Sequence, residues 1–164
     1  MTAVRIESAS TLDVDTCRRL VLGNEPWITL QYGEADVQRI VGAVTRSNLF
    51  VARAADRIVG FALSTEGFLL GEYLTLLAVD RTVHRQGIGR QLMAALEDHA
   101  FATWPNVYLC VSDFNHRARH FYRQLGYEEV GLLRDLLVVG AAEVLMRKTV
   151  GVWRGYRAAT GTRA

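Results

Sequence analysis

Cysteine and proline are scarce in this sequence, and a large net charge of either sign is lacking. The two cysteines, Cys17 and Cys110, form no spaced framework, which excludes a disulfide scaffold and favours a reducing compartment. The two prolines stand far apart and 50% of the residues are apolar, which excludes a disordered or fibrous chain. The formal net charge is only +2, so a broad nucleic-acid-binding face is not expected.

Membrane-spanning runs and a secretory pattern are also lacking. The start, MTAVRIESAS, has neither a charged n-region nor an apolar h-region, and no apolar run reaches membrane-spanning length. We therefore expect a soluble, cytoplasmic protein without a membrane partner. A chain of 164 residues is long enough for one domain with a real core and hardly for two. We expect residues 1–150 to form that domain and residues 151–164 to form a weakly patterned tail.

Strand-like and helix-like patterns interleave along the chain. The expected strands cover residues 3–9, 48–54, 57–66, 72–80, 106–112, 127–139 and 142–150. The expected helices carry apolar stripes at Leu12, Cys17, Leu20 and Val21, at Val37, Ile40, Val41 and Val44, at Ile88, Leu92, Leu96 and Ala100, and at Ala118, Phe121, Tyr122 and Leu125. Thr11 or Asp13 would cap the first helix, and Gly126 would end the last. This order predicts an α+β domain in which a mixed, strongly twisted sheet is flanked by helices, with the nearly continuous apolar segment 72–80 as a central strand.

Two glycines interrupt the stretch VDRTVHRQGIGRQLMAALEDHA (residues 79–100) just where an apolar helix begins. Backbone amides at such a strand–Gly-x-Gly–helix junction can converge on one anion, and the helix N-terminus adds positive potential. Gly87 and Gly89 would let a phosphate approach the backbone, and Arg85 and Arg90 could add charged contacts. The motif is neither a dinucleotide fingerprint, because Leu92 replaces the third glycine, nor a P-loop. Taken alone, a plain glycine turn with solvated arginines explains it equally well.

A second motif follows the next expected strand. In NHRARHFYRQLGY (residues 115–127) the spacing is Asn-x-x-Ala-x-x-Phe-Tyr-x-x-x-Gly-Tyr, and the first motif is Leu-Ala-Val followed by HRQGIG. Together the two motifs, their separation and the element order over residues 3–150 resemble the GNAT superfamily of N-acetyltransferases. The resemblance implies the GNAT three-layer fold and acetyl-CoA as co-substrate, without a metal.

The resemblance also implies roles for particular residues. The strand Leu77, Ala78 and Val79 would splay from its neighbour and pair its backbone with the pantetheine arm, while Asn115 would bond the same arm. The diphosphate would be held by the backbone amides of Gln86, Gly87, Ile88, Gly89 and Arg90, next to the charged contacts of Arg85 and Arg90. Tyr122 would lie beside the sulfur as the candidate donor to the leaving thiolate; as a residue of the apolar stripe it could equally be a core aromatic. His84 replaces the Gln or Arg of the family motif, which leaves a side-chain contact there open.

The general base is not apparent from the sequence. Some relatives that acetylate protein N-termini carry a glutamate five residues before the motif asparagine, and Cys110 stands there in this chain. Cys110 is a poor base, and a lone cysteine on an apolar strand is usually inert core rather than the site of an acyl-enzyme. The other candidates are Glu25, Glu72, Asp113 and Glu143, or a water chain. The loop GNEPWITLQYG (residues 23–33), with Trp27 and Tyr32, is expected to shape the acceptor pocket.

The leading hypothesis is therefore an acetyl-CoA-dependent N-acetyltransferase that acts on a primary amine of a small molecule, a protein N-terminus or a lysine. A module that senses acetyl-CoA without turnover is the alternative, and an anion-binding adaptor for nucleic acid is disfavoured by the near-neutral charge. His116 and His120 stand one helical turn apart but lack a further ligand, so a solvated helix face is preferred over a metal site. The acceptor and a homodimer are left open.

Overall fold

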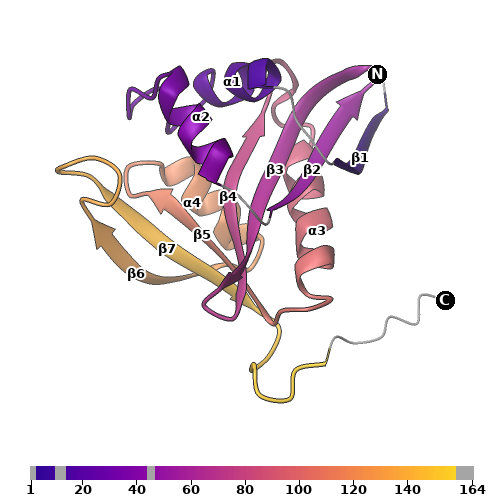
Figure 1. Cartoon of the computed structure of the whole chain (residues 1–164), viewed down its shortest axis with the longest axis vertical. Coiled ribbons are helices and arrows are strands. Elements are labelled where there is room, and N and C mark those ends of the chain that lie inside the picture. Colours follow the sequence, from indigo (N-terminus) through magenta and orange to yellow (C-terminus); the bar gives the residue numbers. More distant parts are fainter. Residues whose placement is uncertain (1–2, 10–13, 44–46, 158–164) are drawn as a thin grey trace.

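The computed structural model describes residues 3–9, 14–43 and 47–157, in which strands and helices interleave as expected (Figure 1). The strands are β1 (Val4–Ala9), β2 (Ser47–Ala54), β3 (Arg57–Phe68), β4 (Gly71–Val79), β5 (Asn106–Ser112), β6 (Glu128–Arg134) and β7 (Ala142–Thr149). The helices are α1 (Val14–Leu22), α2 (Glu34–Ala43), the 3-10 turn η1 (Arg81–Val83), α3 (Ile88–Ala100) and α4 (His116–Gln124). The expected cap residues Thr11 and Asp13, and the stripe residues Leu12 and Val44, lie outside the described residues.

The strands form one mixed sheet in the order β1-β2-β3-β4-β5-β7-β6. β4 and β5 run parallel, and the other neighbouring pairs are antiparallel. Helices α1 and α2 cover one face, and α3 and α4 cover the other (Figure 1). The predicted α+β class, the mixed sheet and the three layers are confirmed.

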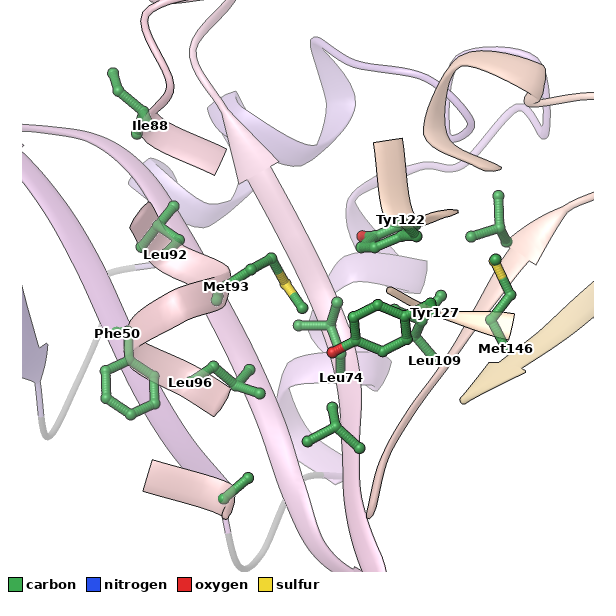
Figure 2. Close-up of a cluster of buried hydrophobic side chains, with 14 of the residues drawn as sticks. Phe50, Leu74, Ile88, Leu92, Met93, Leu96, Leu109, Tyr122, Tyr127 and Met146 are labelled. Atoms are coloured by element: carbon green, nitrogen blue, oxygen red, sulfur yellow. The ribbon is translucent and has the colours of Figure 1, made fainter. Parts of the chain in front are cut away.

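The larger core cluster lies between the sheet and the helices α3 and α4. The expected stripe of α3 is buried, with Met93 in addition to Ile88, Leu92, Leu96 and Ala100. Figure 2 shows Met93 of α3 extending toward Leu74 of β4, with Tyr127 beside Leu74; Leu92, Leu96 and Tyr122 belong to the same cluster. A second cluster on the opposite face joins Leu20 and Val21 of α1 and Val37 of α2 to β2, β3 and β4.

The predicted strand over residues 127–139 is too long. β6 ends at Arg134, because the chain turns at Asp135, whose φ is 55°. The Asp135 carboxylate accepts a hydrogen bond of 2.7 Å from the amide of Gly140, whose own φ is 82°. The side chain and the glycine therefore close the β6–β7 turn earlier than the apolar run suggested.

The described part of the expected tail packs against the domain. The rings of Trp153 and Trp104 stack with centroids 5.4 Å apart. The Tyr156 hydroxyl donates a hydrogen bond of 2.7 Å to the Phe101 carbonyl. Residues 151–157 thus pack against the end of α3 and the connection from α3 to β5 (Figure 1).

Strands β4 and β5 pair only at their beginning. Their register joins Glu72–Leu74 to Val107–Leu109 and ends there. On the other side of β4, the pairing with β3 shifts between Leu63 and Ser64, so the chain bulges near Thr75. A bulge bends a strand and increases its twist, so the second half of β4 leaves β5. The predicted splay of Leu77–Val79 is therefore present as a V-shaped opening in the sheet (Figure 1).

The divergence also decides how β4 is buried. Although the sequence of β4 is almost continuously apolar, full and partial burial alternate along the strand. Leu74, Leu76 and Ala78 are buried in the two core clusters. Leu77 and Val79 are only partly buried, because they line the cavity described below.

Gly71 permits the close approach of the paired ends of β4 and β5. A Cβ atom at this position would lie 2.6 Å from the backbone oxygen of Asn106 and 2.9 Å from the Tyr108 ring. A contact with backbone at this distance requires the two strands to separate.

We expect Gly71→Ala to destabilise the protein by roughly 1–3 kcal/mol, the usual cost of overpacking. Gly131→Ala in β6 is the matched control, because a Cβ there meets no described atom within 4 Å and its φ is not positive. Urea unfolding of both variants measures the difference. Equal stability of the two would show that the strands do not need the glycine.

Candidate functional site

A cavity of about 910 Å³ lies between the end of β4 and helix α4, beyond the point where β4 leaves β5. It is lined by the residues after the bulge in β4, by the loop that enters α3, and by one face of α4. Of the residues predicted to bind the cofactor, Leu77, Ala78, Val79, Arg85, Gly87, Ile88, Gly89, Arg90 and Asn115 line it. Gln86 is exposed and is not among the lining residues, so its predicted contact stays a prediction.

The N-terminus of α3 opens into this cavity. Gly87 is the N-cap with a φ of 76°, and no side chain of the described chain caps the helix there. The first amides of a helix have no acceptor within the helix, so those of Ile88, Gly89 and Arg90 are available to an anion. Arg85, with a φ of 64°, and Arg90 add two guanidinium groups at the rim. The geometry is that of a cradle for a phosphate or diphosphate.

The two glycines of the motif have different surroundings. At Gly87 a Cβ atom would meet no described atom within 4 Å, and the positive φ is what requires glycine. At Gly89 the Cβ direction points at the Phe121 ring, 3.5 Å away, and at Val79. Gly87, Gly89, Phe121 and Val79 all line the larger cavity, so the predicted approach of a phosphate to both glycines stays a prediction.

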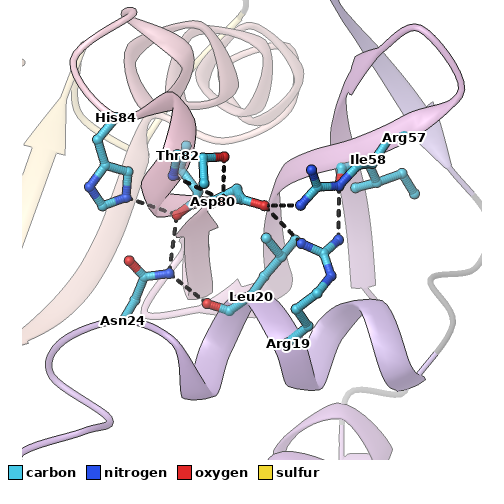
Figure 3. A network of polar contacts seen from close by, with 9 residues as sticks. Arg19, Leu20, Asn24, Arg57, Ile58, Asp80, Thr82 and His84 are labelled. Atoms are coloured by element: carbon cyan, nitrogen blue, oxygen red, sulfur yellow. Dashed lines mark hydrogen bonds and ion pairs between the residues drawn. The ribbon is translucent and has the colours of Figure 1, made fainter.

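Asp80, which the sequence reasoning missed, organises the entry to the cradle (Figure 3). It is buried at the end of β4, and its Oδ1 accepts hydrogen bonds from the Thr82 amide, 3.0 Å, and the Thr82 hydroxyl, 2.7 Å. Its Oδ2 pairs with Arg19 of α1, at 2.9 Å, and with Arg57 of β3. Burial alone would raise the pKa of Asp80, but the Thr82 bonds and the two guanidinium groups outweigh it and leave the pKa lowered.

The carbonyl of Val79 is held by two side chains. Asn24, from the loop after α1, donates from Nδ2 at 3.1 Å, and His84 donates from Nε2 at 2.9 Å (Figure 3). The side chain of His84 thus holds the end of β4, and His84 also lines the larger cavity. A paired acid and amide from distant segments carry no local sequence pattern, so only the fold could identify Asp80 and Asn24.

We expect Asp80→Asn to lower the stability by roughly 1–3 kcal/mol, because the variant keeps an acceptor for Thr82 but loses both ion pairs. The difference from the wild type should be full at pH 7 and shrink as the pH falls below the unfolded aspartate value of about 3.9, since the lowered pKa of Asp80 stabilises the fold only while the carboxylate is charged. Thermal unfolding between pH 3 and pH 7 measures this. A pH-independent difference would contradict the ionic role of Asp80.

A second cavity of about 260 Å³ adjoins the first on the side of α2 and the β6–β7 turn. Trp27 and Tyr32 line it, as expected for the loop over residues 23–33, together with Tyr73 of β4 and Cys110 of β5. The residues that line both cavities are Glu25, Trp27, Leu77, Asn115, Ala118 and Tyr122. The two cavities therefore meet where β4 leaves β5.

Tyr122 lies at this junction and is only 7% exposed. Its ring packs edge-on against Phe121 and Tyr127, so it is also part of the core (Figure 2). Burial raises the pKa of Tyr122, and its hydroxyl keeps its proton. Its position fits both predicted readings, since it combines a packed ring with a hydroxyl at the cavity junction.

Asn115 caps helix α4, in addition to its predicted contact with the cofactor arm. Its Oδ1 accepts a hydrogen bond of 3.1 Å from the Ala118 amide and so caps α4. Its Nδ2 donates to no other residue in the described ranges, and the residue lines both cavities. That amide group can serve a bound molecule while the oxygen holds the helix.

The five candidate bases have different surroundings. Glu143 is buried and lines the smaller cavity, while Glu25 is exposed and lines both. Glu72 is buried elsewhere, and Asp113 lines neither cavity. Burial raises the pKa of Cys110, with a smaller opposing effect from Tyr73, so this residue remains a thiol at neutral pH.

The described residues hold no group of three or more His, Cys, Asp or Glu side chains arranged for a metal ion. His116 and His120 are exposed on α4, in agreement with a solvated helix face. No helix within the described ranges is long and apolar enough to cross a bilayer.

Comparison with known proteins gives concordant matches. The model of the acetyltransferase (GNAT) family matches residues 15–127. A Mycobacterium leprae protein without assigned function is 33% identical over 87% of this chain, which spans 40% of the length of that relative. The N-alpha-acetyltransferase RimI of Mycobacterium tuberculosis is 31% identical over 90% of this chain and 94% of its own. The crystal structure of an aminoglycoside 6'-N-acetyltransferase with coenzyme A superposes with a TM-score of 0.71 at 20% identity, covering 90% of this chain and 98% of that one.

Proposed function

The chain belongs to the GNAT acetyltransferase family, and from that premise we propose that it transfers the acetyl group of acetyl-CoA to a primary amine. The observation that carries the proposal is the junction of the two cavities at Leu77, Asn115 and Tyr122. The larger cavity suits an elongated co-substrate that carries a diphosphate, and the smaller suits the end of an amine. The reacting atoms would meet at the junction.

The residues present fit acetyl-CoA. Its diphosphate would bind the free amides at the start of α3, where Gly87 leaves open space and Arg85 and Arg90 add charge. Its amide-containing arm would pair with the unpaired edge of β4 after Leu74. Asn24 and His84 already occupy the Val79 carbonyl, so the arm would use the remaining backbone groups of Leu77–Val79 and the Asn115 amide. When bound, acetyl-CoA supplies an activated thioester carbonyl.

Tyr122 would donate a hydrogen bond to the leaving sulfur. A tyrosine of ordinary pKa, about 10, is already a weaker acid than a thiol of about 8.5, by roughly 2 kcal/mol. Because burial raises the pKa of Tyr122 further, complete proton transfer would be still more uphill. Tyr122 therefore stabilises developing negative charge as a donor rather than as a full acid.

The acceptor side is apolar and aromatic, with two carboxylates, Glu25 and Glu143, at its wall. Such a lining suits the cationic end of a primary amine. The relatives span both classes of acceptor, since one is named as an N-alpha-acetyltransferase and one as an aminoglycoside acetyltransferase. A non-catalytic acetyl-CoA sensor is the alternative, and turnover distinguishes the two.

Saturating acetyl-CoA should stabilise the protein, by about 2.7 kcal/mol at a hundred times its dissociation constant. NAD and ATP at equal concentration should stabilise it less, because neither has an arm that can pair with β4. Thermal shift and calorimetry measure the binding. Thiol release with propylamine, an alanine-initiated peptide, Nα-acetyl-lysine and an aminoglycoside then tests turnover. Binding without release from any of them would favour the sensor, and the absence of binding would refute the proposed function.

We expect Tyr122→Phe to reduce kcat on the order of 10–10³-fold, because one transition-state donor is removed. Acetyl-CoA affinity should hardly change, since the ring that packs against Phe121 and Tyr127 is kept. Calorimetry and steady-state kinetics on the same preparation separate the two effects. Unchanged turnover would assign Tyr122 to the core alone.

A further inference from the structure

We propose that Glu143, on β7, is the general base that takes the proton from the acceptor amine, directly or through one water. This inference rests on the proposed function and names the residue that the family motifs leave unassigned in this chain.

The placement of Glu143 is the first argument. Its side chain is at the wall of the smaller cavity, which Tyr122 also lines, although the residue is only 4% exposed. Ser112 stands directly opposite it in the β5–β7 register and donates a hydrogen bond of 2.7 Å to Oε1. Oε2 accepts no hydrogen bond from the described residues, and the residue lines the cavity. One oxygen is therefore held in position and the other is available to an amine.

The described part of the chain also places no cation beside Glu143. In the described ranges no Lys, Arg or His side chain forms an ion pair with Glu143. The groups that interact with it are neutral or acidic: Ser112, Cys110 and Asp113 at the end of β5, Tyr73 of β4 and Tyr32 of the loop after α1. Tyr122 and Glu25 line the same cavity. A buried carboxylate without a partner is costly. An ammonium group that enters the cavity would supply that partner.

The register explains how β7 can supply the base. Cys110 pairs with Leu145 and Ser112 pairs with Glu143, so Glu143 is the diagonal neighbour of Cys110 on the same face of the sheet. The carboxylate that the resemblance places at position 110 is thus replaced by one from the adjacent strand. Burial raises the pKa of Glu143, which the Ser112 bond partly offsets and the Asp113 charge reinforces, and this makes it a stronger base than an exposed glutamate.

The other carboxylates fit less well. Glu72 is also buried and also bonded by a serine hydroxyl, that of Ser64, but it accepts a further bond from Asn48 and lines neither cavity. Glu25 is exposed, and its Oε2 accepts the Thr29 amide at 3.2 Å.

The protons balance in this scheme. An ammonium acceptor gives one proton to the Glu143 carboxylate and becomes a neutral amine, whose nitrogen forms the bond to the carbonyl carbon as the bond from carbon to sulfur breaks. The nitrogen loses a second proton as the amide forms, and the thiolate takes one proton to become the thiol. Glu143 returns its proton to solvent, so one proton is released in each turnover.

The test is Glu143→Gln, with Glu72→Gln as the matched control. With the amine of the panel that is acetylated fastest, Glu143→Gln should lower kcat/KM at pH 7 on the order of 10²-fold. The rising limb of its pH profile should move up toward the pKa of the free amine, while acetyl-CoA binding stays intact. Glu72→Gln should keep the wild-type profile. An unchanged profile in folded, acetyl-CoA-binding Glu143→Gln overturns the inference, whereas a wild type that does not bind acetyl-CoA overturns the proposed function instead.

Thermal unfolding without substrate tests whether the Glu143 carboxylate is charged and lacks a cationic partner. A raised folded pKa means that the charged Glu143 destabilises the fold above that pKa and not below the ordinary glutamate value of about 4.3. Glu143→Gln should therefore melt at a higher temperature than the wild type at pH 8, and the gain should vanish at pH 4. Equal melting temperatures at pH 8 would show that the carboxylate is already neutralised, which contradicts its availability to an amine.

Discussion

The short pairing between β4 and β5 is the constraint on which the rest of the site depends. The two strands meet over three residue pairs, where Gly71 allows contact with Asn106, and then separate at the bulge near Thr75. A parallel pair in the middle of a sheet normally continues, because unpaired buried backbone is costly. Here the separation exposes the edge of β4 to a cavity, so a bound chain with amide groups can complete the pairing.

Polar side chains at the C-terminal end of β4 stabilise the opening between β4 and β5. The buried Asp80 ties the loop before α3 to α1 and β3, and Asn24 ties the loop after α1 to the end of β4. The loop over residues 23–33, which lines the smaller cavity, is thereby attached to the segment that leads into α3. The two cavities share a wall, so a few hydrogen bonds, and not the sheet alone, position one relative to the other.

Much of this fold could be predicted from local patterns. The apolar stripes of α3 and α4, the hairpin of β2 and β3 and the glycine cradle depend on residues close together in the sequence, where periodicity and turn chemistry are informative. The strand predicted over residues 127–139 is too long, because the prediction followed the apolar content of the segment. The turn at Asp135 depends on a single side-chain hydrogen bond, which the apolar pattern does not reveal. Asp80, Asn24 and the surroundings of Glu143 could not be predicted, since each depends on partners tens of residues away. The roles assigned to the cofactor-binding residues and Tyr122 stay predictions, although nearly all of these residues lie around one cavity.

The three tryptophans of the chain divide between two places. Trp27 belongs to the wall shared by the two cavities, whereas Trp104 and Trp153 stack on each other where the residues after β7 meet the end of α3. Because Trp27 lines both cavities, its fluorescence should change when a molecule enters them. Exciton coupling between the stacked rings of Trp104 and Trp153 should appear in circular dichroism and be lost if residues 151–157 detach. The molecule thus contains its own optical reporters for ligand occupancy and for the attachment of its C-terminal segment.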